Sequence, residues 1–83
     1  GFEVAGRVLT PDGRGLRNGR VTMLDSNGVA QTVTTSSFGY YRFEDVAPGG
    51  TFTVSVVSKQ YRFGLRTVSV TGSLADLDFV GLE

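Results

Sequence analysis

A regular alternation of apolar and hydroxyl side chains between Thr51 and Ser58 constrains the fold more than any other feature of the sequence. Phe52, Val54 and Val56 fall on one face of this segment, and the residues between them are threonine or serine. Since successive side chains of a strand point to opposite faces of a sheet, a period of two predicts a half-buried β-strand. We expect this strand to lie in the centre of its sheet.

Six further segments have strand character, and turn residues separate them. They span residues 2–10, 20–25, 29–36, 40–43, 65–71 and 75–82. Pro11-Asp12-Gly13 predicts a turn, and Asn27-Gly28 predicts a hairpin in which both residues reach positive φ. Residues 45–50 predict a loop. Seven short strands with no helix between them predict an all-β, antiparallel sandwich of the immunoglobulin-like type.

The length and the charge balance limit what the chain can be. With 83 residues it can form one hydrophobic core, so we expect residues 1–83 to be a single domain. Because the sequence has no initiator methionine and both ends fall just outside predicted strands, we expect this domain to be cut from a larger protein. Eight basic residues balance eight acidic ones, so the chain has no net positive charge that would attract nucleic acid. No apolar run is long enough to span a bilayer. We therefore expect neither nucleic-acid binding nor direct membrane insertion.

The sequence contains no cysteine and no histidine. Without cysteine there is no disulfide and no thiolate ligand, and without histidine the usual general base and the commonest zinc ligand are missing. Serine is plentiful, but no base is evident that could activate it. We therefore predict a domain that is not an enzyme, with no catalytic residue, no cofactor and no metal.

Two groups of charged residues have both a functional and a simpler interpretation. Asp76 and Asp78 could form an acid–base pair or a calcium pair, but we favour a solvated strand face that discourages edge pairing. A basic patch for phosphate, glycan sulfate or nucleic acid could form from Arg7, Arg14, Arg17 and Arg20. Arginines interleaved with glycine are more often a solvated turn, so this patch is the minor hypothesis.

A succession of motifs carries a resemblance to a known family. Gly6-Arg7-Val8 leads to Asp12-Gly13 and to Asn18-Gly19-Arg20-Val21, and the centre of the chain contains Thr34-Thr35, Gly39-Tyr40-Tyr41-Arg42-Phe43 and Val46-Ala47-Pro48-Gly49-Gly50-Thr51-Phe52. In this order they resemble the carboxypeptidase regulatory-like domain, a transthyretin-like and collagen-adhesin B-type β-sandwich. The resemblance covers nearly the whole chain. We interpret the following as structural turn and motif positions: Gly6, Gly13, Gly19, Gly28, Gly39, Pro48 and Gly49.

The sequence departs from the family pattern at two places. Gln60-Tyr61 stands where the family usually has Gly-Tyr, and Ser36 stands where it often has aspartate. A serine hydroxyl can replace that carboxylate as a weaker turn acceptor. The family's collagen-adhesin relatives can carry lysine isopeptide bonds, but Lys59 lies after a middle strand and both asparagines lie in turns, so we expect no such bond.

The resemblance implies an accessory or structural domain of an exported protein. We therefore expect an extracytoplasmic, non-catalytic structural or spacer module whose partners are the neighbouring domains of its own polypeptide. The alternatives are a carbohydrate- or peptide-binding module and an accessory domain attached to a peptidase. The candidate contact residues for a sugar or peptide, whose aromatic and guanidinium planes could act together, are Tyr40, Arg42, Tyr61 and Arg62.

Overall fold

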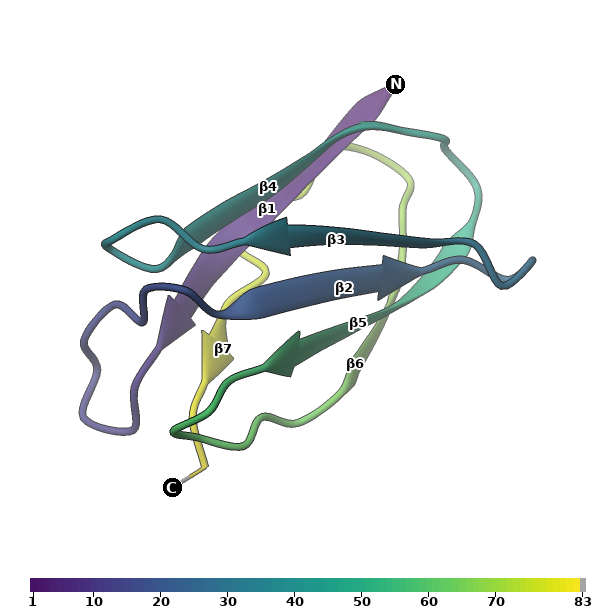
Figure 1. Ribbon diagram of the computed structural model, residues 1–83. Helices are drawn as coiled ribbons and strands as arrows, with labels where there is room; N and C mark the ends of the chain where they lie inside the picture. The colour runs from purple at the N-terminus through teal and green to yellow at the C-terminus, as the bar shows by residue number, and fades with distance from the viewer. Residues whose placement is uncertain (83) are drawn as a thin grey trace.

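The computed structural model describes residues 1–82 and places seven strands in two stacked sheets (Figure 1). In chain order the strands are β1 (Phe2–Leu9), β2 (Arg20–Leu24), β3 (Ala30–Thr34), β4 (Tyr40–Val46), β5 (Thr51–Val57), β6 (Arg66–Ser69) and β7 (Phe79–Val80). One sheet has the order β4-β1-β7 and the other β3-β2-β5-β6. The predicted all-β, seven-stranded immunoglobulin-like sandwich is confirmed. Within residues 1–82 no helix is long and apolar enough to cross a membrane.

The four-stranded sheet is antiparallel throughout and follows the alternation of the sequence. Strand β5 lies inside the sheet between β2 and β6, as predicted. Its inward residues Phe52, Val54 and Val56 are all buried. The outer face carries short hydroxyl side chains, and the Oγ1 atoms of Thr22 and Thr32 lie 3.0 Å apart across β2 and β3. The apolar face of this sheet supplies one half of the core.

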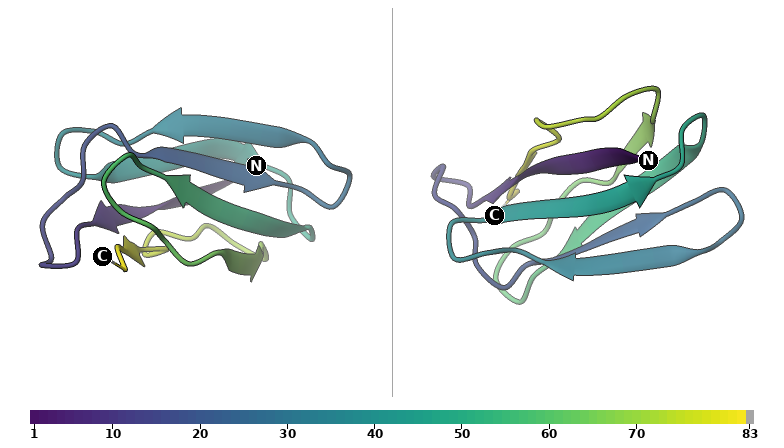
Figure 2. Two further views of the ribbon diagram at one scale, coloured as in Figure 1. Left: turned by 60° about the horizontal axis from the view of Figure 1, so that its bottom comes forward. Right: turned by 90° about the horizontal axis from the view of Figure 1, so that it is seen from above.

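Within residues 1–82 the fold departs from the antiparallel arrangement in the three-stranded sheet. Strand β1 pairs antiparallel with β4 but parallel with β7, at Val8↔Phe79 and Leu9↔Val80. The predicted last strand, residues 75–82, is correspondingly reduced to two residues. After β6 the chain crosses from the other sheet and runs beside the free edge of β1 in the same direction (Figure 2).

A mixed set of hydrogen bonds, here called the terminal ladder, joins β1 to residues 73–81. Side chains take the place of carbonyl oxygens at two rungs, because Glu3 N–H donates to Ser73 Oγ and Arg7 N–H donates to Asp78 Oδ1, at 3.0 and 2.8 Å. The backbone rungs run from Leu74 N–H to Glu3 O, Ala5 N–H to Leu74 O, Leu77 N–H to Ala5 O and Gly81 N–H to Leu9 O. Residues 74–78 are therefore held along β1 without forming a regular strand.

The core lies between the sheets and draws on both. Its buried members are Val4, Val8, Leu16, Val21, Met23, Tyr41, Phe43, Val46, Phe52, Val54, Val56, Val70, Leu77 and Phe79. The Tyr41 ring lies edge-on to Phe43, with centroids 6.0 Å apart, and 6.3 Å from Phe79. These three aromatic side chains and that of Leu77 therefore all point into the core. Such contacts fix the strand register, because a one-residue slip would turn each side chain outward.

Strand β4 is longer than predicted because a β-bulge carries it past Phe43 to Val46. Val4 pairs with Phe43 and Phe2 with Val46, so β4 has one extra residue between these two pairs. Asp45 has φ 57°, and aspartate is one of the few side chains that tolerates this left-handed conformation. The loop predicted to begin at Asp45 therefore begins after Val46.

Three turns share one pattern of hydrogen bonds. Each ends on glycine with φ between 84° and 89°, and in each the first residue accepts from the glycine N–H. Its side-chain oxygen also accepts from the N–H of the fifth residue: Arg14 N–H donates to Thr10 Oγ1, Val29 N–H to Asp25 Oδ1 and Tyr40 N–H to Ser36 Oγ. The predicted role of Ser36 as turn acceptor is thus confirmed.

The hairpin between β2 and β3 forms as predicted, but with a different turn. Only Gly28 of the Asn27-Gly28 pair has positive φ, at 84°. Asn27 instead donates its N–H to Asp25 Oδ1 at 2.9 Å. Five residues rather than two connect the paired positions Leu24 and Ala30, so the prediction of a tight Asn-Gly turn was wrong.

The remaining motif positions have local structural roles. A Cβ on Gly6 would lie 1.9 Å from the Leu77 carbonyl oxygen. Only glycine therefore allows β1 to approach residues 73–82, here called the terminal segment, this closely. Gly19 is buried and donates its N–H to Thr35 Oγ1 at 2.9 Å. Pro48 and Gly49 form the exposed turn between β4 and β5, where Gly49 N–H donates to Val70 O.

Candidate functional site

Tyr40 and Arg42, two of the four predicted contact residues, lie together on the exposed face of β4. The Arg7 guanidinium lies 4.9 Å from the centroid of the Tyr40 ring, and Arg7 Nε donates to Phe38 O at 2.8 Å. Arg42 forms an ion pair with Glu44 at 3.2 Å. Both side chains are more than half exposed, so these contacts orient them without removing them from solvent.

Tyr61 and Arg62, the other two, belong to the connection between β5 and β6. Tyr61 is partly buried and packs against the core, and its Cβ lies close to Gly81. The Arg62 carbonyl accepts a hydrogen bond from Leu82 N–H at 2.8 Å. Tyr61 and Arg62 therefore hold the end of the terminal segment through their contacts with Gly81 and Leu82. Within residues 1–82 no hydrogen bond, ion pair or ring contact joins them to Tyr40 or Arg42.

The carboxylates are distributed rather than paired. Asp78 accepts from Arg7 N–H in the terminal ladder, so it is a structural acceptor and not the purely solvated side chain that the sequence predicted. The Thr10 hydroxyl, followed by the charge of Arg14, lowers the pKa of the exposed Asp12 carboxyl. Among residues 1–82 no three metal-ligating side chains gather at one place.

Within residues 1–82 Tyr41 is the core residue whose pKa departs strongly from its ordinary value. Its hydroxyl donates to the Leu77 carbonyl, which ties β4 to the terminal segment through the interior. Burial, reinforced by the negative charge of Asp78, raises the pKa of this phenol above its ordinary value. The group is only 5% exposed, so it stabilises the fold rather than meeting a ligand.

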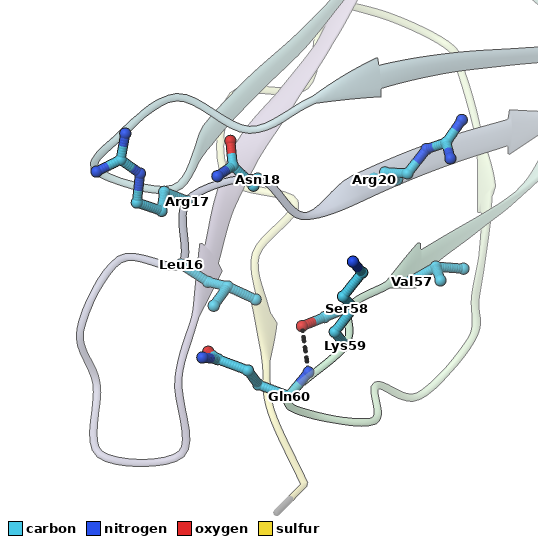
Figure 3. Close-up of a pocket in the computed structure, with 8 residues that line it drawn as sticks. All are labelled: Leu16, Arg17, Asn18, Arg20, Val57, Ser58, Lys59 and Gln60. Carbon is cyan, nitrogen blue, oxygen red and sulfur yellow. Dashed lines mark hydrogen bonds between the residues drawn. The ribbon is translucent and has the colours of Figure 1, made fainter.

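A groove of about 590 Å³ lies between the β1–β2 connection and the end of β5. Its lining is Leu16, Arg17, Asn18, Arg20, Val57, Ser58, Lys59 and Gln60 (Figure 3). Three cations and no carboxylate line it. Figure 3 shows the side chains of Arg17 and Arg20 pointing away from each other, and Arg14 is paired with Asp12 at 3.1 Å. The predicted basic patch is therefore spread over the surface and does not converge on one anion.

A second groove, here called the edge groove, has a volume of about 450 Å³ and lies where the two sheets open between β3 and β4. It is lined by Ala5, Val33, Thr34, Ser36, Tyr40, Tyr41 and Arg42. Two of the four predicted contact residues thus share a concave surface. The edge groove is the better of the two candidate sites, because it combines an aromatic ring, a guanidinium and an exposed strand edge.

Sequence reasoning missed three polar residues that hold the domain together. Ser73 and Asp78 complete the terminal ladder. Buried Thr35 donates to Leu16 O at 2.6 Å while accepting from Gly19 N–H, which anchors the wall of the first groove. A threonine between two strand segments was the available signal for Thr35, whereas nothing local distinguishes Ser73 or Asp78 from other surface residues.

Comparisons with known proteins agree with this architecture. The carboxypeptidase regulatory-like domain matches residues 3–80. The C-terminal fragment of the pilus adhesin SpaC from Lactobacillus rhamnosus GG has a similar structure, with a TM-score of 0.54 and 13% sequence identity over 99% of this chain and 45% of that fragment. At this identity the likeness shows the fold alone. No curated protein matches the chain. Because the family match covers residues 3–80, the chain belongs to the carboxypeptidase regulatory-like domain family.

Proposed function

We propose that the domain is a non-catalytic structural spacer in a larger exported or cell-surface protein, with the neighbouring domains of the same polypeptide as its partners. The observation that carries this proposal is the parallel pairing of β1 with β7. Because β1 and β7 are parallel neighbours, the chain enters the domain at one end and leaves it at the opposite end (Figure 1). The domain is elongated, with a longest extent of 34 Å.

The terminal ladder suits such a spacer mechanically. A pull on the start of β1 and the end of β7 acts along the two strands in opposite directions, so the rungs are loaded in shear. Hydrogen bonds loaded in shear must break together, whereas those of a hairpin pulled apart at its open end break one at a time. Family membership and the adhesin neighbour fit a non-catalytic surface or structural module.

Single-molecule pulling between the two termini tests the proposal. We expect one unfolding event that lengthens the chain by roughly 250 Å, at about 3.4 Å per residue. Its rupture force should clearly exceed the force measured when the C-terminal handle is moved to Gly28, in the β2–β3 turn. The N-terminus and this turn lie at the same end of the domain, so that pull acts across the strands and peels them apart (Figure 1). Equal forces in the two geometries would contradict a mechanical role for the terminal ladder.

The edge groove supports a second candidate function, the binding of a carbohydrate or an extended peptide. NMR titration with glycan and peptide panels would test it, with Tyr40→Ala as the variant and Tyr61→Ala as the control outside the groove. Binding should shift the signals of Tyr40 and Arg42 and weaken in the Tyr40 variant. An accessory role beside a peptidase would be favoured only if a peptidase domain lies in the same polypeptide.

A further inference from the structure

The outer edge of β3 lacks the devices that protect the other sheet edges of this domain. Arg42 and Glu44 place charges on β4, and Arg66 on β6 donates from Nη1 to Asp78 O at 2.8 Å, which bridges the two sheets on that side. No charged residue occurs anywhere between Ser26 and Tyr41, and that stretch contains no proline. Charges, prolines and bulges are what keep exposed edges from pairing with another chain.

The backbone groups of β3 point alternately toward β2 and toward solvent. Asp25 N–H donates to Val29 O and Thr35 N–H donates to Gly19 O, so the odd-numbered residues of this segment bond to β2. In an antiparallel ladder the residues between them direct N–H and C=O away from the partner strand. Ala30, Thr32 and Thr34 therefore present their backbone groups at the open edge.

We infer that β3 is a self-pairing edge, through which a second copy of this chain adds its own β3 in antiparallel orientation about a two-fold axis at Thr32. The outward-bonding residues are symmetric about that position. Thr32 meets Thr32 of the second copy, and Ala30 meets Thr34 on both sides. A two-fold axis sets like residues against each other, so a charge at the centre would repel itself, and β3 carries none.

The pairing continues features already present in the sheet. The outer-face row Ser55–Thr22–Thr32 would extend into Thr32–Thr22–Ser55 of the second copy, which joins two four-stranded sheets into one of eight strands. On the inner face, half-buried Val33 would lie opposite Gln31. The formal net charge of zero adds no long-range repulsion between copies. This inference is independent of the spacer proposal.

The association is expected to be weak in free solution. Pairing along five residues buries much less than the roughly 1,200 Å² of a stable specific interface, so we expect a dissociation constant of about 0.1–1 mM. It gains importance where copies are held at high local density, because effective concentrations of that order make weak contacts form. Sedimentation of the full chain across this concentration range should show dimers, with the Ala30, Thr32 and Thr34 amide signals shifting together.

A charge swap at the axis tests the register. Thr32→Lys and Thr32→Glu should each weaken self-association about fivefold or more, because like charges meet at the axis. An equimolar mixture of the two variants should restore it, since lysine then faces glutamate. Circular dichroism and thermal melting of each variant verify that it is folded. Thr67→Lys on β6, the other outer edge of the same sheet, is the matched control and should leave self-association unchanged.

Three results would overturn the proposal. A chain that stays monomeric up to about 2 mM, above the expected dissociation constant, would assign the edge to a strand from a different polypeptide. Dimers that survive Thr32→Lys but not Thr67→Lys would place the interface on β6. Failure of the mixed Thr32→Lys and Thr32→Glu variants to associate, with both folded, would rule out pairing at a two-fold axis on Thr32.

Discussion

The two sheets of this domain are built by different means. In the four-stranded sheet every pair is antiparallel and the register runs without interruption, from β3 through β2 and β5 to β6. In the three-stranded sheet β4 contains a bulge, β7 is parallel to β1, and two rungs of the terminal ladder depend on the side chains of Ser73 and Asp78. The four-stranded sheet follows the period-two alternation of its strands. The three-stranded sheet also depends on contacts between β1 and residues far away in the sequence.

This difference separates stability from mechanical role. Both sheets supply the apolar core, and the irregular sheet also joins the strand at which the chain enters the domain to the segment at which it leaves. If the terminal ladder were only loosely attached to β1, the domain could not carry a load between its ends. The changes considered next either damage both sheets alike or act on the terminal ladder alone.

Truncation of a core aromatic ring should have the largest effect, and it should be similar in both sheets. Phe43 on β4 is 2% exposed and Phe52 on β5 is 8% exposed. Phe43→Ala and Phe52→Ala should each lower the free energy of unfolding by about 3–5 kcal/mol, from lost burial and the cavity that remains. Urea denaturation measures this. An unchanged midpoint for either variant would show that its strand register is wrong.

Gly6→Ala should come next and should act on the three-stranded sheet. The added methyl would meet the Leu77 backbone at 1.9 Å, so β1 and the terminal segment must separate. We expect a loss of about 2–3 kcal/mol in thermal or urea unfolding. Gly64→Ala is the control, because its methyl would meet nothing within 4 Å and should change stability by less than about 1 kcal/mol. Equal effects of the two substitutions would mean that β1 does not approach Leu77 so closely.

Tyr41→Phe should have a smaller effect that depends on pH. The phenol pKa is raised in the folded state, so its stabilising contribution is complete below the ordinary pKa of about 10 and is lost as the pH rises further. At neutral pH the variant should lose about 1 kcal/mol with the bond to Leu77 O. Above a pH of about 10 the stability of the parent should fall toward that of the variant.

Tyr40→Phe is the matched control for this pH dependence. Tyr40 is exposed on the outer face of β4, and its hydroxyl makes no bond to the Leu77 carbonyl. The alkaline loss of stability should therefore persist in this variant. Its disappearance in Tyr40→Phe, or its persistence in Tyr41→Phe, would assign the titration to a group other than Tyr41.

Asp78→Ala should have the smallest effect on global stability and a local effect on the terminal ladder. It leaves Arg7 N–H without its acceptor, and we expect a loss of about 1 kcal/mol because the site is open to water. Asp76→Ala removes a carboxylate whose side chain makes no ladder contact and should cost less than about 0.5 kcal/mol. Equal losses would mean that the carboxylate of Asp78 contributes nothing specific.

The success of the sequence prediction follows the same division between the sheets. Alternation at Phe52, Val54 and Val56 is a local property, so β5 and its central place could be predicted. The parallel course of the last segment could not, because no local pattern states which edge of β1 is free. The bulge at Asp45 could not be predicted either, because an aspartate at this position of the sequence is equally typical of the start of a loop.

The candidate site shows the same limit. Tyr40 and Arg42 share one face of a strand by their spacing of two, and the structure places both in the edge groove. Tyr61 and Arg62 were grouped with them by residue type alone. They lie instead against the terminal segment, because Arg62 O accepts from Leu82 N–H. Spacing along one strand predicts a shared face, whereas composition does not predict proximity between strands.

Native-state hydrogen exchange tests most directly whether the terminal ladder belongs to the same cooperative unit as the four-stranded sheet. Amides at Ala5, Arg7, Leu77 and Gly81 donate across the ladder, and buried Val21 and Val54 report on the other sheet. We predict one opening free energy for both groups, equal to that of global unfolding. Exchange of the ladder amides at a distinctly lower free energy would show that the terminal segment opens independently, and it would contradict the spacer account.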